Sequence, residues 1–157
     1  MSDLPDFTNY SQVDLVQQTI AFLTNRPMYG AAQHVAGDVF VGVNTIKTLF
    51  TVSGKGIIYG GIIYAENVAK IANDSIGIYV DGVNTIYTQW KKLHELNLVN
   101  YNDFGVWLNT YDTENGNWSM SIMNGITFEE NFYIRYFEGE SYEKTISYFV
   151  IYSLLNI

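Results

Sequence analysis

The sequence predicts an all-β fold, an antiparallel β-sandwich with one N-terminal helix. From about residue 38 onward, short apolar segments alternate with Gly, Asn and Asp at intervals of about ten residues, which is typical of a sandwich or barrel. Aromatic residues favour strands, and they make up 16% of the 157 residues, with 13 Tyr among them. A chain of this length is expected to form one domain. We place an N-terminal arm and helix at residues 1–30 and the sandwich at residues 31–157.

The first part of the chain predicts an arm followed by a helix. Residues 1–10 have the character of an extended arm, and Ser11 is suited to begin a helix because Asp14 then lies near the positive end of the helix dipole. Pro27 marks the end of the helical pattern, so we expect a helix over residues 11–24. Apolar residues at helical spacing form a stripe that would pack on a partner surface: Val13, Val16, Ile20 and Leu23.

Two segments after residue 45 predict strands of different kinds. The segment 46–52 alternates, and the residues expected on one face are Ile46, Thr48, Phe50 and Val52. The segment 56–65 is apolar on both faces, which predicts a buried central strand. Gly60-Gly61 within it predicts a bulge or a close backbone approach, because glycine tolerates both.

Turn signals predict two hairpins and a meander. Asp81-Gly82 suits a two-residue type I′ turn between strands at 75–80 and 83–89. A second hairpin is expected between 105–111 and 117–123. Asn124-Gly125 would then turn the chain into a third strand of the same meander. The segment 89–98 is compatible with a short helix or with another strand.

Large side chains on both faces of predicted strands indicate contacts with another chain. Each sheet of a sandwich has only one inner face, so outward aromatic residues are expected to meet a partner. The segment 132–137 is the clearest case. The candidate interface therefore combines the helical stripe with Phe132, Tyr133, Tyr136 and Phe137.

Composition excludes several classes of partner. The 16 acidic residues outnumber the 8 basic ones, and the net charge of −8 argues against binding to nucleic acid. The chain has no cysteine, which excludes disulfides and thiolate chemistry. No secretory signal pattern and no 18-residue apolar run is present, so we expect synthesis in a cytoplasm and no membrane partner.

The chain lacks a motif that would carry catalysis. Ser53-Gly-Lys-Gly56 lacks the spacing of a phosphate-binding loop, and His34 and His94 alone do not make a zinc site. The loop 112–117 is rich in oxygen atoms, but it places Gly where a calcium loop needs a ligand. Four carboxylates are expected to be solvated at strand ends and turns: Glu129, Glu130, Glu138 and Glu140. We therefore expect a non-enzymatic protein without catalytic residues, metal ligands or cofactors.

An alternative function is carbohydrate binding by a sandwich that exposes Trp and Tyr residues. Trp118 lies next to a predicted turn, where rings that stack on sugars often lie, so it is the candidate platform. Packing in the core or between subunits is the competing interpretation of its ring.

The residue order from Ser53-Gly-Lys-Gly-Ile-Ile-Tyr-Gly-Gly61 to Ile76-Gly-Ile-Tyr-Val-Asp-Gly82 resembles that of bacteriophage virion structural proteins of jelly-roll type. The resemblance covers about residues 46–155 and carries no site residues over. It implies a jelly-roll sandwich with an N-terminal arm, acting as a capsid decoration protein or tail component. It further implies a homo-oligomer, with a trimer favoured, that contacts other virion proteins and is located in the virion after synthesis in the host cytoplasm.

Overall fold

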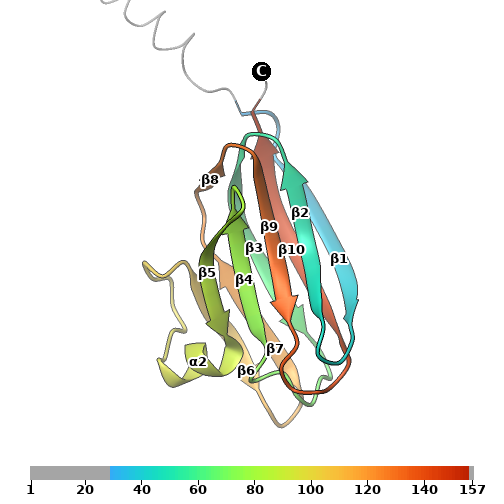
Figure 1. Cartoon of the computed structure of the whole chain (residues 1–157). Coiled ribbons are helices and arrows are strands. Elements are labelled where there is room, and N and C mark those ends of the chain that lie inside the picture. Colours follow the sequence, from blue (N-terminus) through green and yellow to red (C-terminus); the bar gives the residue numbers. More distant parts are fainter. Residues whose placement is uncertain (1–28, 156–157) are drawn as a thin grey trace, which may run out of the picture. The chain divides into compact units, whose positions relative to one another are not determined.

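The structure, a computed structural model, describes residues 29–155, and these form a sandwich of two antiparallel sheets (Figure 1). The first sheet contains, in spatial order, β1 (Gln33–Val41), β10 (Lys144–Leu154), β3 (Gly56–Ala65), β7 (Asn117–Ile122) and β6 (Val106–Asp112), with β8 (Ile126–Phe128) also paired to β3. The second sheet contains β2 (Ile46–Ser53), β9 (Asn131–Phe137), β4 (Ser75–Val80) and β5 (Val83–Gln89). The predicted all-β sandwich is thus confirmed, whereas the predicted helix at 11–24 lies outside the described residues.

The strand order is that of a jelly roll. With β6 and β8 set aside, the first sheet runs β1-β10-β3-β7 and the second runs β2-β9-β4-β5. The first strand therefore pairs with the last, and the second with the next to last, which is the double Greek-key arrangement. The inner faces of the two sheets enclose a core of aliphatic side chains that are fully buried, among them Ile58, Ile63, Ile78, Ile134, Ile146 and Val150.

The β3 strand occupies the centre of the first sheet and carries the predicted bulge. It lies between β10 on one side and β7 and β8 on the other. Tyr59 is the extra residue, because Ile58 and Gly60 pair with adjacent residues of β10. Gly60 has a φ of 145°, a conformation that a side chain would strain. The predicted central position and bulge are both confirmed, whereas the predicted burial holds only for the inner face, because Tyr59 on the strand is 38% exposed.

Both predicted hairpins are present. In the β4–β5 hairpin, Asp81 and Gly82 have φ angles of 51° and 78°, as a type I′ turn requires. The β6–β7 hairpin pairs the predicted segments, from Val106 with Ile122 to Asp112 with Asn117. Local turn chemistry is therefore sufficient to define these two hairpins.

The predicted meander is wrong. After Asn124-Gly125 the chain forms β8, which pairs with β3, and β9 then lies in the second sheet between β2 and β4. The change of sheet occurs at Glu129-Glu130, whose backbone amides donate hydrogen bonds to the Asp81 carboxylate at the β4–β5 turn. A contact with a residue about fifty positions earlier thus directs the chain into the other sheet.

The predicted face of β2 is also corrected. The register with β9 shifts between Thr48 and Phe50, so Leu49 is the extra residue of a bulge. Phe50 points into the core, whereas Ile46, on the other side of the bulge, points outward and is 59% exposed. A pattern of alternate residues cannot reveal such a change of face.

The ambiguous segment 89–98 forms a short helix, α2 (Trp90–Glu95). Trp90 and Leu93 are fully buried and attach the helix to the end of the sandwich. The Trp90 indole N–H donates to the Tyr136 hydroxyl at 3.3 Å. Burial of these two side chains, rather than a strong helical pattern, explains the helix.

Candidate partner interface

The structure separates the predicted interface residues of β9 into two groups. Phe132 and Tyr136 point into the core and are fully buried, so they pack between the sheets and are not available to a partner. Tyr133 and Phe137 lie on the outer face of the second sheet and are partly exposed. The difference follows from the two-residue period of a strand, which places alternate side chains on opposite faces. The other four predicted interface residues, Val13, Val16, Ile20 and Leu23, lie outside the described residues.

Tyr133 is part of an aromatic stack on the outer face of the second sheet. Its ring lies 4.6 Å from the ring of Tyr79, its direct partner on β4, with an angle of 10° between the planes. The Arg135 guanidinium lies 5.3 Å from the centre of the Tyr79 ring and 5.1 Å from that of Tyr133, within cation–π range. A Cβ on Gly77 would lie 2.8 Å from the Tyr79 ring, so only glycine leaves room for this arrangement.

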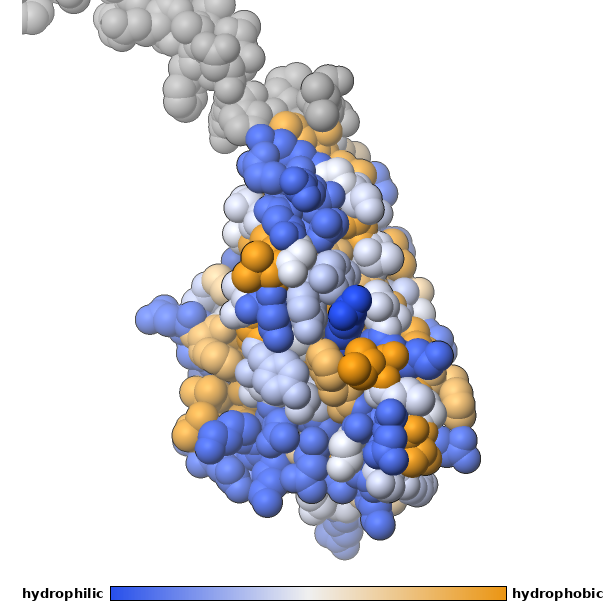
Figure 2. Space-filling view, in the orientation of Figure 1, coloured by the Kyte–Doolittle hydropathy of each residue, from blue (hydrophilic) through white to orange (hydrophobic). Residues whose placement is uncertain are grey.

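Further apolar side chains extend the stack across the whole sheet. The Phe137 ring meets Tyr87 of β5 edge-on at 5.4 Å, and Phe137 pairs with the exposed Ile46 of β2 on its other side. We call this surface the aromatic face, and it consists of Ile46, Tyr79, Tyr87, Tyr133, Arg135 and Phe137. Figure 2 looks onto this sheet and shows pale and orange side chains in its middle, mixed with a few strongly hydrophilic ones, and further hydrophilic ones above and below.

The apolar surface continues past the edge of the sheet at β5. A hollow of about 400 Å³ lies between β5, α2 and the segment that follows α2. We call it the edge hollow, and its lining residues are Tyr87, Thr88, Gln89, Lys92, Leu96, Leu98 and Phe104. Leu96 and Phe104 are about half exposed, at 56% and 45%. Since Tyr87 belongs to both surfaces, the aromatic face and the edge hollow are neighbours.

One cluster of charged groups is buried rather than presented to a ligand. The Lys144 ammonium contacts the carboxylates of Asp74 at 2.5 Å and Glu138 at 3.3 Å, and all three side chains are fully buried. Its third hydrogen bond goes to the backbone oxygen of Lys70 at 2.8 Å. Glu138 was expected to be solvated, and that expectation is wrong. The cluster ties together loops at one end of the sandwich.

Each carboxylate of the buried cluster is satisfied by further donors. Asp74 accepts hydrogen bonds from the Gly139 amide and from the Tyr136 hydroxyl, at 2.8 and 2.6 Å. Burial raises the pKa of Asp74, because these bonds and Lys144 offset only part of its desolvation. Burial alone would also raise the pKa of Glu138, but three backbone amides and Lys144 lower that pKa to about 2. These groups therefore hold the fold together.

The other residues considered as metal ligands from the sequence interact with neighbouring residues of the same chain. Asp112 accepts hydrogen bonds from the amides of Glu114 and Asn115, so its carboxylate closes its own loop. The rings of His34 and His94 stack on Phe149 and Tyr111. Among residues 29–155, no cluster of three or more His, Cys, Asp or Glu residues is placed to hold a metal ion.

Trp118, the predicted sugar platform, is a core residue. Its ring is 2% exposed and meets Tyr111 edge-on at 4.8 Å, and its indole N–H donates to the Val68 oxygen at 2.8 Å. The alternative of a stacking platform at Trp118 is therefore wrong, and the competing interpretation, packing in the core, is confirmed.

The residues that build the aromatic face were only partly visible in the sequence. Tyr133 and Phe137 were named as candidates, but Tyr79, Tyr87 and Arg135 were missed. Alternation within each strand could have placed each side chain on a face, yet the register between β4, β5 and β9 depends on contacts distant in sequence.

In the described part of the chain, no helix is long and apolar enough to span a membrane. Comparison with known proteins assigns no family, because no protein-family model and no curated protein matches the sequence. Among solved structures, the chain is similar to a chain of the cyanophage Pam1 capsid asymmetric unit, with 12% sequence identity and a TM-score of 0.49. The match covers 83% of this chain and 89% of that chain. A similarity at this level establishes neither a shared function nor a shared assembly.

Proposed function

We propose that this chain is a non-enzymatic structural protein of a bacteriophage virion, a capsid decoration protein or tail component, and that copies of it assemble through the aromatic face. The aromatic face carries the proposal. A solvated outer face of an antiparallel sheet normally presents polar side chains, whereas this one presents tyrosine, phenylalanine and isoleucine on all its strands. Surfaces of this kind mark sites of protein association.

The virion part of the proposal is supported by the resemblance in the sequence. Its first segment, residues 53–61, includes the start of the central strand β3, and its second, residues 76–82, includes β4 and its type I′ turn. The strand order is that of a jelly roll, which is the fold that the resemblance implies. Because a fold alone does not define a function, the virion location needs its own test.

A trimer is the favoured assembly because it is what the resemblance in the sequence implies. In a closed three-fold ring, each subunit uses one surface toward one neighbour and a different surface toward the other. The edge hollow, which includes Tyr87, and the rest of the aromatic face are two such surfaces. Contact between the aromatic face of one copy and the edge hollow of the next would cover Phe104 and Leu96, which are about half exposed in the single chain.

Light scattering on the purified full chain tests the assembly. The expected mass is three times the 17.9 kDa of one chain. The double variant Tyr87→Thr and Tyr133→Thr removes two rings of the aromatic face and replaces them with threonine, a β-branched residue that favours strands. This variant should be monomeric. The matched control is Phe40→Thr, which removes an exposed ring from the outer face of the first sheet and should leave the mass unchanged. A wild-type monomer, or an intact oligomer in the double variant, contradicts the proposal.

Immunogold labelling tests the virion location. An antibody raised against the purified chain is applied to phage particles from a lysate in which the gene is expressed. Label at regular positions on the particles supports the proposal. Label confined to the soluble fraction, with bare particles, contradicts it.

A further inference from the structure

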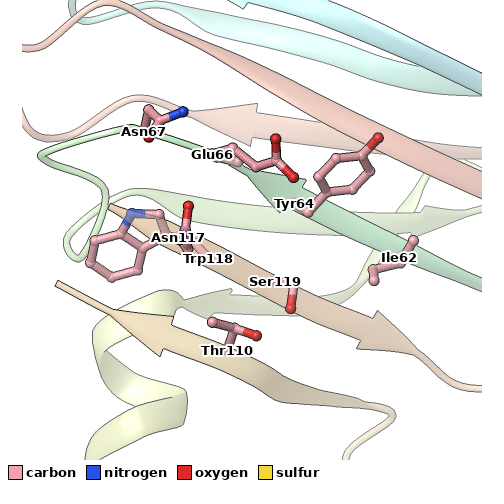
Figure 3. Close-up of a pocket in the computed structure, with 9 residues that line it drawn as sticks. Ile62, Tyr64, Glu66, Asn67, Thr110, Asn117, Trp118 and Ser119 are labelled. Atoms are coloured by element: carbon pink, nitrogen blue, oxygen red, sulfur yellow. The ribbon is translucent and has the colours of Figure 1, made fainter. Parts of the chain in front are cut away.

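A second hollow lies on the outer face of the first sheet, on the side of the sandwich away from the aromatic face. It has a volume of about 570 Å³ and is formed where β3, β7 and β6 run side by side (Figure 3). Polar side chains dominate its lining. Those that bear hydroxyl, amide or carboxylate groups are Tyr64, Glu66, Asn67, Thr110, Asn117 and Ser119.

Tyr64 forms an aromatic wall of this hollow. On β3 it is flanked in register by Ser147 of β10 and Ser119 of β7, and Ser119 is in turn opposite Thr110 of β6. A row of hydroxyl groups therefore crosses the sheet with the Tyr64 ring standing above small neighbours. In Figure 3 the Tyr64 ring rises from β3, with Glu66 beside it and Ser119 and Thr110 across from it. The ring lines the hollow, in the position from which it would stack on a flat ligand.

The polar side chains that line the hollow do not hydrogen-bond to each other. Among residues 29–155, the six polar side chains of the lining make no side-chain hydrogen bond. Polar groups just outside the hollow are paired, as in the bond from Asn109 to Ser121 at 2.6 Å and that from Ser147 to Asp38 at 2.5 Å. The hollow therefore concentrates donors and acceptors that are available to a ligand.

The floor and rim of the hollow are fixed by close backbone contacts. The Val68 amide donates to the Gly116 oxygen at 3.0 Å, and the Val68 oxygen accepts the indole N–H of Trp118. A Cβ on Gly116 would lie 2.7 Å from the Val68 oxygen, so the two loops touch directly. The segment that bears Glu66 and Asn67 is thereby held beside β7, and a ligand would meet a largely preformed site.

We propose that this hollow binds a neutral saccharide. Tyr64 would stack on the apolar face of a sugar ring, while Ser119, Asn117 and Glu66 would hydrogen-bond its hydroxyl groups. The lining contains no Lys or Arg, and its one charged group is the Glu66 carboxylate, so acidic glycans are disfavoured. The volume suits one or two sugar rings, because small-molecule sites are typically about 300–1,000 Å³. This activity is independent of the proposed assembly, since it uses the opposite sheet.

The test begins with the full chain on an array of neutral and acidic glycans, and the best neutral glycan is then titrated by calorimetry. Tyr64→Ser should weaken its binding about tenfold or more through the loss of stacking. The matched control is Tyr59→Ser, which removes a partly exposed ring from the same strand outside the hollow and should bind normally.

Three results would overturn this inference: no neutral glycan binds above background, only acidic glycans bind, or Tyr64→Ser binds as tightly as the wild type. The mass of each variant in solution is measured in parallel and should not change. That readout separates a failure of the saccharide site from a failure of the proposed assembly, because the aromatic face is intact in both variants.

Discussion

Three charged residues form a buried cluster that stabilises one end of the sandwich: Asp74, Glu138 and Lys144. The single positive charge of Lys144 lies between the carboxylates of Asp74 and Glu138, and the three side chains have no access to solvent. Removing one partner of such a cluster leaves buried charges without compensation, which costs far more than losing an ion pair at the surface. The cluster is therefore expected to be sensitive to single substitutions.

Lys144→Met is predicted to lower the free energy of unfolding by about 3–5 kcal/mol, because Asp74 and Glu138 would then repel each other in a dry site. Urea denaturation followed by tryptophan fluorescence measures the change. The matched control is Lys55→Met, which breaks the exposed ion pair with Glu129 and should leave the free energy of unfolding nearly unchanged. Equal losses in the two variants would show that the buried cluster does not stabilise the fold.

The loss of folding stability at acidic pH should depend in part on the titration of Glu138. Its pKa is lowered from 4.5 to about 2, so its contribution is present above pH 4.5 and is lost as the pH falls toward 2. The raised pKa of Asp74 has the opposite sign and favours the folded state at low pH, which reduces the net effect. Glu138→Gln should flatten the decline in urea midpoint between pH 4.5 and pH 2. An unchanged slope in this variant would mean that other groups cause the acid sensitivity.

At the level of single residues, sequence reasoning succeeded where the cause is local. The positive φ angles of Asp81 and Gly82 follow from their own chemistry and were predicted. Burial of Glu138 was not predicted, because two of its amide donors, Glu140 and Tyr142, belong to its own turn, whereas the loop that covers it supplies the Asn44 amide from 94 positions away. The partner of the Trp118 indole N–H, the Val68 oxygen, is likewise 50 positions away, so the sequence left both core packing and a surface platform open for this ring.

Among the elements, the β4–β5 hairpin has a second role beyond its own turn. The Asp81 carboxylate accepts hydrogen bonds from three consecutive amides, those of Glu129, Glu130 and Asn131. These bonds lower the pKa of Asp81 and attach the turn between β8 and β9. A side chain of one turn thus fixes the point at which the chain moves from the first sheet to the second.

Asp81→Ala is predicted to lower the temperature of unfolding, because three amides lose their acceptor and alanine disfavours a positive φ. Thermal unfolding measures the effect. Asp81→Asn serves as the comparison, since asparagine tolerates this turn and retains one acceptor oxygen, and its loss should be smaller. If both variants are as stable as the wild type, the link between the two turns is not a determinant of the fold.

The same contrast between local and distant causes holds for elements. The two hairpins and the central strand were predicted from turn residues and apolar runs. The meander prediction was wrong because β9 pairs with β2 and β4 in the second sheet. The predicted face of β2 was wrong because the bulge at Leu49 places Ile46 and Thr48 on the opposite face from Phe50. The short helix α2 could not be distinguished from a strand, because only two of its side chains are fully buried.

In the described unit as a whole, the two outer faces of the sandwich differ in chemistry. One carries the aromatic face, and the other carries a polar hollow beside Tyr64. Excess tyrosine in the composition indicated that outward rings would need partners, but it could not assign them to a sheet. Our proposal for these two faces is therefore that one joins subunits while the opposite face binds a ligand.

The absence of cysteine from the chain permits a direct test of where copies meet. A nitroxide label is attached to Thr48→Cys, on the outer face of the second sheet, or to Thr145→Cys, at a matched exposed position on the first sheet. Electron paramagnetic resonance then reports the mobility of each label as the protein is diluted. We predict that the label at position 48 is immobilised in the oligomer and becomes mobile on dissociation, while the label at position 145 is mobile throughout. Equal mobility of the two labels in the assembled protein would contradict the claim that the aromatic face is the interface.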